Sequence, residues 1–128
     1  MLGADTLVAL GDRVFGKPAD LAEAHSMLEA LSGRIHEVLT GVCLVRDDKM
    51  CRFVESTRVK FRPRDEVDLD AYFRHVDPLD KAGAYAAQED EGRLIECIEG
   101  SLSNVIGLPI ERVLQTIQEY FPEAWLES

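Results

Sequence analysis

The sequence lacks the features that mark exported, membrane-spanning or disulfide-bonded proteins. Its apolar runs are all too short to cross a bilayer. No basic segment followed by an apolar stretch opens the chain, so we expect neither export nor a membrane partner. The three cysteines, Cys43, Cys51 and Cys97, include no CxxC pair. Their odd number and wide spacing indicate reduced thiols, used as small core residues, in a cytoplasmic protein.

Positive charge is also scarce. The chain has 14 lysines and arginines against 24 aspartates and glutamates, for a formal net charge of −10. Such a surface repels long polyanions, so we expect no nucleic-acid partner and no binding to anionic membranes. A small anionic ligand is compatible with this charge, provided that a metal ion or local lysines neutralise it.

Several widespread catalytic motifs are missing. The sequence contains no Gly-x-x-x-x-Gly-Lys-Ser/Thr phosphate loop, no Gly-x-Gly-x-x-Gly and no Gly-x-Ser-x-Gly. His25, His36 and His75 do not have the spacing of a metal site. We interpret His36, at the entrance to a strand, as a residue that orients backbone rather than a metal ligand.

The chain does contain enough apolar material for one folded domain. With 128 residues and a hydrophobic composition of 46%, it is expected to form a single domain over residues 1–128. Apolar and β-branched runs predict strands over residues 7–10, 38–45, 50–62 and 94–98. Helical periodicity predicts helices over residues 21–31, 69–76 and from Pro109 to Pro122. This order indicates a mixed α/β arrangement, and the sheet cannot be wholly parallel because the two central strands form a hairpin.

Local signals sharpen some of these expectations. The helix over residues 21–31 has Asp20 as its N-cap and Gly33 as its end. Residues 101–107 are expected to form a loop. Residues 79–88 are rich in small side chains, which favours either close approach of backbone to a ligand or an ordinary loop. The last helix is expected to bury an apolar face made of Ile110, Val113, Leu114 and Ile117.

One glutamate conflicts with its surroundings. In the strand over residues 50–62, Val59 and Phe61 indicate that the odd-numbered residues face the core. Period two places Glu55 on the same face, where a carboxylate costs free energy unless it is paired or binds a metal. The alternative is that Glu55 lies at the exposed end of the sheet, beyond the core.

The candidate site residues are carboxylates, lysines and an amide at element ends and in loops. They are Asp5, Lys17, Glu55, Asp80, Lys81 and Gln88. Carboxylate oxygens of this kind suit Mg²⁺ or Mn²⁺, which can bridge a carboxylate and substrate phosphates.

Taken in order, these segments resemble the Maf, or septum-formation-inhibitor, family of nucleotide pyrophosphatases. The matching motifs extend over nearly the whole chain. They are Gly3-Ala4-Asp5-Thr6, Gly16-Lys17-Pro18, residues 31–42, residues 55–61, residues 77–85 with Gln88, residues 98–100 and residues 103–109. The form Asp80-Lys81-Ala82-Gly83-Ala84-Tyr85 with Gln88 is similar to the subgroup that prefers dTTP and UTP over 7-methyl-GTP.

The resemblance implies a fold, an activity and roles for residues. It implies the elongated mixed sheet with flanking helices of inosine triphosphate pyrophosphatases, usually as a homodimer. It also implies hydrolysis of dTTP or UTP to the monophosphate and pyrophosphate with Mg²⁺ or Mn²⁺. Asp5 is implied as general base or metal ligand, and Glu55 and Asp80 are further metal candidates. The residues implied to contact substrate or set base preference are Thr6, Lys17, Lys81 and Gln88.

The chain also departs from the family pattern. Family members begin with a strand and a Ser-x-Ser-x-Arg-Arg segment before the Ala-Asp-Thr motif, whereas here only Met1-Leu2 precede Gly3. We therefore expect an N-terminally truncated fold with an unpaired sheet edge or apolar face, and slow turnover without the arginines. Three functions stay open: a dTTP/UTP pyrophosphatase, a catalytically impaired remnant that dimerises or binds partners, and an unrelated α/β domain with a coincidental match.

Overall fold

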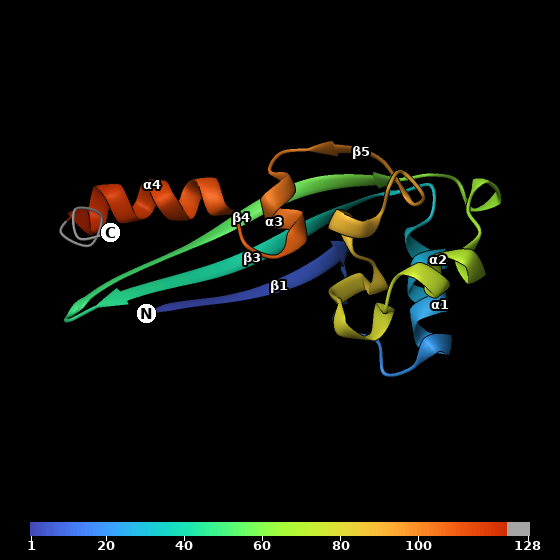
Figure 1. Ribbon diagram of the computed structural model, residues 1–128, viewed down its shortest axis with the longest axis horizontal. Helices are drawn as coiled ribbons and strands as arrows, with labels where there is room; N and C mark the ends of the chain where they lie inside the picture. Colours follow the sequence, from blue (N-terminus) through green and yellow to red (C-terminus); the bar gives the residue numbers. More distant parts are fainter. Residues whose placement is uncertain (123–128) are drawn as a thin grey trace.

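A computed structural model of the protein describes residues 1–122, which form a long antiparallel sheet with helices at one end and along one face (Figure 1). The strands are β1 (Leu2–Leu10), β2 (Arg13–Phe15), β3 (Ile35–Arg46), β4 (Lys49–Phe61) and β5 (Ile95–Glu99). The helices are α1 (Leu21–Leu31), α2 (Leu69–His75), α3 (Leu102–Ile106) and α4 (Ile110–Tyr120). Four short 3₁₀ turns are η1 (Arg64–Glu66), η2 (Pro78–Asp80), η3 (Ala82–Ala84) and η4 (Ala87–Glu89).

The strand order in the sheet is β2-β1-β3-β4-β5, and every pairing in the described part of the chain is antiparallel. The α/β class and the elongated sheet are confirmed, but the prediction of a mixed sheet is wrong. The reason lies in the connection between β1 and β3. The chain returns through β2 and α1 at the end of the molecule where β1 finishes, so β3 starts there and runs back along β1.

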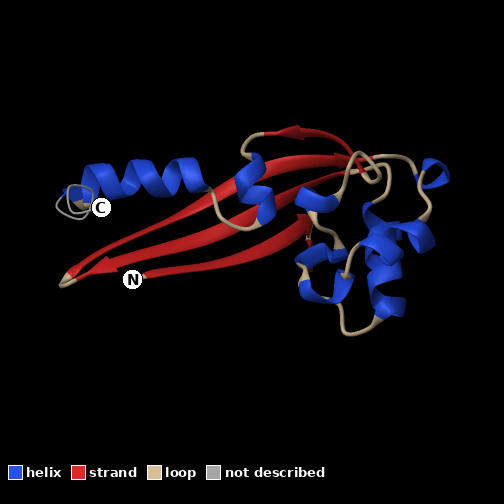
Figure 2. Cartoon of the chain, in the orientation of Figure 1, coloured by secondary structure: helices blue, strands red, loops and turns tan. Residues whose placement is uncertain are grey.

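The central hairpin of β3 and β4 is the longest feature of the fold (Figure 2). Its strands pair from Ile35↔Lys60 to Arg46↔Lys49, which confirms the predicted hairpin. β1 is longer than predicted, because Leu2 to Thr6 pair with β3 although they lack an apolar alternation. Backbone pairing to an existing strand decides the structure here, where side-chain pattern is uninformative.

The two faces of the sheet differ. Val8, Val38 and Val59 lie on the face that packs against helices and turns, and each is at most 2% exposed. On the opposite face, Leu7 and Val54 are 42% and 61% exposed. Period two therefore holds for all three long strands, and the face with Val8 is the one on which the core is built.

The core has two parts. The larger part lies at the end with α1, α2 and the 3₁₀ turns and includes Phe15, Leu28, Phe61 and Tyr72. The smaller part lies beneath α4 and consists of Val42, Leu44, Val113 and Phe121. Burying one such side chain is worth roughly 1.5–3 kcal/mol, so the smaller part is enough to hold α4 against the extended end of the hairpin (Figure 1).

Helix α1 has the predicted bounds and the predicted cap. The Asp20 carboxylate accepts a hydrogen bond of 2.8 Å from the Glu23 amide, which pairs one of the free N–H groups of the first turn. Gly33 follows the helix with a φ of 68°, a value that favours glycine because it has no Cβ.

Two predictions near the C-terminus are wrong. Residues 101–107 contain helix α3, which Ser101 caps by accepting from the Asn104 amide and which ends at Gly107. Helix α4 buries Val113 and Thr116, whereas Ile110 and Leu114 are 51% and 45% exposed. The helix packs on one sheet face only, so half of its apolar residues have no layer to face.

The cysteines are free thiols. Cys97 is exposed and therefore not a core residue, while Cys43 and Cys51 are half-buried. Within residues 1–122, no helix has both the length and the apolar character needed to cross a membrane.

Candidate functional site

A cleft of about 480 Å³ lies beside the outer edge of β1. Five parts of the chain form its walls: β1, β3, the segment after β2, the 3₁₀ turns and the end of α3. The polar residues that line it are Asp5, Thr6, Lys17, Asp80, Lys81 and Gln88. Six of the seven predicted site residues therefore share one cleft, although they come from distant parts of the sequence.

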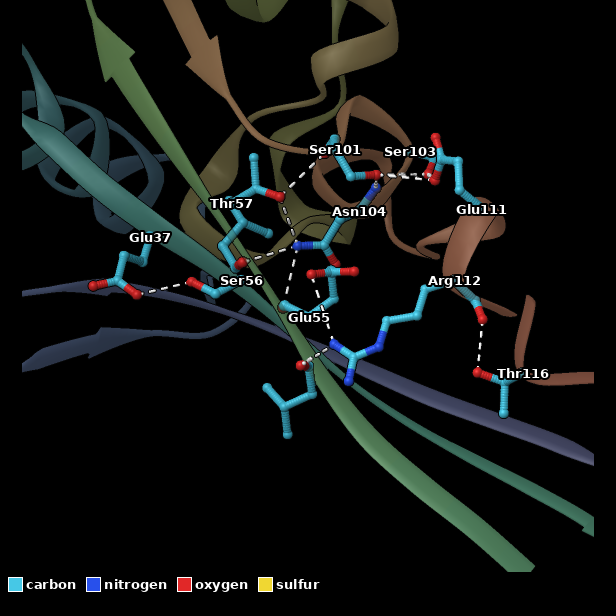
Figure 3. Close-up of polar contacts among 12 residues, drawn as sticks. Glu37, Glu55, Ser56, Thr57, Ser101, Ser103, Asn104, Glu111, Arg112 and Thr116 are labelled. Atoms are coloured by element: carbon cyan, nitrogen blue, oxygen red, sulfur yellow. Dashed lines mark hydrogen bonds and ion pairs between the residues drawn. The ribbon is translucent and has the colours of Figure 1, made fainter. Parts of the chain in front are cut away.

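Glu55 is the predicted site residue that does not line this cleft. It lies in β4 with its side chain 28% exposed, and its Oε1 is 3.7 Å from Nη1 of Arg112 on α4. The guanidinium also donates to the Val54 carbonyl at 2.9 Å and lies 4.5 Å from the centre of the Phe53 ring. The inward-facing glutamate is thus paired with an arginine that the sequence pattern did not single out (Figure 3).

Asp5 and Thr6 occupy opposite sides of β1, as neighbouring strand residues must. Asp5 is exposed and borders both the cleft and a second depression on the open sheet face. Thr6 is half-buried, with its Oγ1 3.0 Å from Thr40 Oγ1 and 3.3 Å from the carbonyl oxygen of Gly107. Thr6 therefore ties β1 to β3 and to the end of α3, while the Asp5 carboxylate stands free of that network.

The edge of β1 at this point is open. β2 pairs with Val8 to Leu10 only, so Leu2 to Leu7 have β3 as their single neighbouring strand among the described residues. Backbone groups along such an edge have no strand partner on the cleft side. The predicted unpaired edge is therefore present in the described structure.

Gly83 brings the two lysine-bearing segments together. Its amide donates a 3.1 Å hydrogen bond to the carbonyl of Gly16, the residue before Lys17. Its φ is 72°, and a Cβ at this position would lie 2.9 Å from Cγ2 of Val8. The close approach needs glycine, and it places Lys17 and Lys81 in walls of the same cleft. Lys81 Nζ also lies 3.9 Å from the Asp80 carboxylate.

A buried polar pair stands behind this wall. His36 is 1% exposed, and its Nε2 lies 2.7 Å from the hydroxyl of Tyr85, which lines the cleft. Burial lowers the pKa of His36 to about 4 and raises the pKa of Tyr85, so both groups are neutral near pH 7. The interpretation that His36 orients backbone is wrong, since its partner is a side chain.

Asn104 on α3 was also missed by sequence reasoning, although Figure 3 places it at the centre of a polar network. Its Nδ2 lies 3.0 Å from Thr57 Oγ1, 3.1 Å from the Val38 carbonyl and 3.2 Å from the Glu55 carbonyl. These contacts fix α3 to β3 and β4, and thereby hold Gly107 in the cleft wall. The capping serine before α3 was the only local signal, because the other partners are distant in sequence.

Two features of the cleft bear on whether it can hold a divalent metal. Within residues 1–122 no group of three His, Cys, Asp or Glu side chains is arranged to hold a metal ion. The cleft offers two carboxylates, Asp5 and Asp80. Mg²⁺ is commonly bound by one or two carboxylates, with water and substrate phosphates as the other ligands. The residues present therefore fit a metal that is shared with a phosphorylated substrate, rather than one caged by protein alone.

Comparisons with known proteins find one matching family and a group of similar named proteins. The sequence profile of the family described as Maf-like protein matches residues 1–120. The chain is 42% identical over 120 residues to proteins named dTTP/UTP pyrophosphatase from Bacillus cereus strain AH187 and from Bacillus anthracis. The aligned part covers 94% of this chain and 63% of each relative, and 59% of a protein with the same name from Bacillus cereus strain ATCC 10987. The chain thus spans less than two thirds of the length of these relatives.

Proposed function

The chain belongs to the Maf-like protein family, and on this basis we propose that it hydrolyses dTTP or UTP to the monophosphate and pyrophosphate. The observation that carries the proposal is the cleft, which gathers carboxylates, lysines and an amide beside one open strand edge. The name shared by the relatives, dTTP/UTP pyrophosphatase, supports the choice of substrate. The proposed cofactor is Mg²⁺ or Mn²⁺, which neutralises phosphate charge when bound.

The proposed chemistry is attack of water on the α-phosphorus, in line with the pyrophosphate leaving group. Asp5 is exposed at the cleft and free of the Thr6 network, which supports its proposed role as general base for the attacking water or as metal ligand. Lys17 and Lys81 bring two positive charges to the same cleft. They would stabilise the charge that develops on the leaving phosphates. Asp80 is the second proposed metal ligand.

Gln88 is the residue proposed to recognise the base. Its side-chain amide carries a donor and an acceptor, which match the O4 and N3–H groups of uracil and thymine. Thr6 has a different proposed part. Because its hydroxyl already contacts Thr40 and the Gly107 carbonyl, it shapes the wall against which the nucleotide packs.

Pyrophosphate release tests this function directly. The protein is incubated with dTTP or UTP and Mg²⁺ or Mn²⁺, and compared with Asp5→Asn and with Asp12→Asn. Asp12 is an exposed turn residue after β1 that does not line the cleft, so it is the matched control. We expect Asp5→Asn to lose about 100-fold or more in rate, as is usual for a general base, and Asp12→Asn to keep its rate. No release by the wild type, or equal release by all three proteins, refutes the proposal.

A second candidate function is a non-enzymatic interaction module, and one observation favours it. Leu2 to Leu7 of β1 present an open edge among the described residues, and such edges are templates for pairing with another chain. This function predicts a dimer by light scattering and no change in melting temperature with nucleotide. A monomer with a clear, metal-dependent shift on adding dTTP contradicts it.

A further inference from the structure

The segment of residues 81–88 carries two of the proposed substrate contacts but has little regular structure of its own. Lys81 opens it and Gln88 closes it, and both line the cleft. Its 3₁₀ turns, η3 and the start of η4, hold few internal hydrogen bonds, among them one of 3.1 Å from the Ala84 amide to the Lys81 carbonyl. The position of both side chains therefore depends on what anchors the segment to the rest of the fold.

Within the described residues, three hydrogen bonds anchor it to distant parts of the chain. Gly83 packs on Val8 and bonds to the Gly16 carbonyl, as described above. The Ala86 amide donates to the Tyr72 hydroxyl at 3.0 Å. The third contact joins Tyr85 to His36 at 2.7 Å, and it is the anchor that ties a side chain of the segment to the central strand β3. In Figure 1 the yellow turns of this region lie beside the end of β1 and next to α1.

Ring packing and burial favour one fixed geometry for the His36–Tyr85 contact. The two rings and the ring of Phe61 pack edge to face, with centroid distances of 4.8–5.4 Å. Such contacts favour defined ring orientations. His36 and Tyr85 are 1% and 5% exposed, so water does not compete for the hydrogen bond.

Proton counting gives the direction of this hydrogen bond. His36 Nδ1 is buried and has no hydrogen-bond partner in the described part of the chain. A neutral imidazole has one donor and one acceptor nitrogen. If Nε2 donated, the bare Nδ1 would be unpaired and the Tyr85 hydroxyl would need a further acceptor. If Tyr85 donates to Nε2, one unpaired Nδ1–H is left, which is the smaller loss.

We propose that His36 is a positioning residue: by accepting the hydrogen bond of Tyr85, it holds residues 81–88 against the sheet and thereby sets the affinity of the cleft for a pyrimidine nucleoside triphosphate. The nucleotide part of this inference rests on the proposed function. His36 itself does not touch the substrate. It acts through Tyr85, which lies four residues after Lys81 and three before Gln88.

Hydrogen exchange and kinetics on the full chain test the proposal together. His36→Leu and Tyr85→Phe remove the hydrogen bond, and Tyr85→Phe does so with the ring in place. His36→Gln offers an acceptor again and is the rescue. Val113→Ala is the control. Val113 belongs to the core part beneath α4, so this substitution lowers global stability without changing a contact of residues 81–88.

We expect amide exchange in residues 81–88 to rise about tenfold in His36→Leu and Tyr85→Phe, the effect of losing one hydrogen bond. His36→Gln should restore the slow exchange. In Val113→Ala, the amides of residues 81–88 should exchange no faster than the amides of β3. The KM for dTTP should rise in the first two variants by a similar factor, with a smaller change in kcat. A residue that serves stability alone would raise exchange everywhere and leave KM unchanged.

Two results on the variants overturn the proposal: unchanged exchange of residues 81–88 in both variants, or faster exchange with an unchanged KM. Failure of the proposed function is seen separately, as absence of pyrophosphate release by the wild type. In that case the dissociation constant of dTTP, measured by calorimetry on the same variants, takes the place of KM. Absence of any dTTP binding by the wild type also refutes the proposal.

Discussion

Replacing Gly83 by alanine tests whether the cleft is held by the contact between residues 81–88 and β1. The backbone of Gly83 has a φ of 72°, and an added Cβ would lie 2.9 Å from Cγ2, 3.2 Å from Cβ and 3.3 Å from Cγ1 of Val8. Val8 is 2% exposed, and a β-branched side chain has little freedom to move away. The substitution therefore strains the backbone and overpacks the core at the same position.

The magnitude follows from these two costs. A non-glycine residue in the left-handed region costs about 1–2 kcal/mol, and overpacking a core costs about 1–3 kcal/mol. Alanine also lowers the conformational entropy of the unfolded chain, which offsets roughly 0.4–1 kcal/mol of this loss in stability. We expect Gly83→Ala to lose about 3 kcal/mol in the free energy of unfolding.

Gly92→Ala is the matched control. Gly92 has a φ of 78°, yet a Cβ there would meet nothing within 4 Å, so only the backbone cost applies. Urea unfolding followed by circular dichroism should separate the two variants by about 2 kcal/mol, or about 1 M in midpoint at an m-value near 2 kcal/mol/M. Equal losses in both variants would show that the Val8 contact does not limit the approach of the segment.

Three further predictions concern the buried and paired groups. Because burial lowers the pKa of His36 from its usual 6.5 to about 4, the unfolded chain takes up a proton on His36 at a higher pH than the folded chain does. Stability should fall by about 3 kcal/mol between pH 6.5 and 4, and less in His36→Gln, as measured by urea unfolding across this range. Asn104→Ala leaves buried acceptors unpaired and should cost about 2–4 kcal/mol; a melting temperature within 2 °C of wild type, a shift of roughly 0.5 kcal/mol or less, contradicts this. Arg112→Met keeps packing on Phe53 but loses the Glu55 pair, and should cost less than about 1 kcal/mol because the arginine is half-exposed; Arg112→Ala should cost more by equilibrium unfolding.

Elements with long, regular patterns could be predicted from the sequence. α1 was found with its cap because apolar spacing, Asp20 and Gly33 all agree on the same boundaries. The hairpin of β3 and β4 was found because β-branched runs flank a turn. α3 was missed because it has five residues, which is too short for a helical period to appear. The exposed half of α4 was missed because periodicity does not reveal how many layers a helix faces.

The site divides in a similar way. Asp5, Lys17, Lys81 and Gln88 could be named from motifs, and the described structure brings them to one cleft. The contacts that support this cleft could not be predicted. His36 and Tyr85 are 49 residues apart, and their meeting depends on how β3 and the 3₁₀ turns pack. The partner of Glu55 lies on a helix whose position also depends on tertiary packing.

The order of strands in the sheet has a consequence for the kinetics of folding. β3 and β4 are joined by a short turn and pair residue by residue, so closing this hairpin costs little chain entropy. β1 pairs with β3 across a longer intervening stretch that includes β2 and α1, and contacts of this kind form later. The edge that borders the cleft should therefore be assembled after the hairpin. We expect alanine variants at Leu7 to speed unfolding while leaving the folding rate nearly unchanged, and variants at Leu39 or Val42 to slow folding in stopped-flow experiments. A ligand that binds the cleft would then slow unfolding and leave the folding rate nearly unchanged.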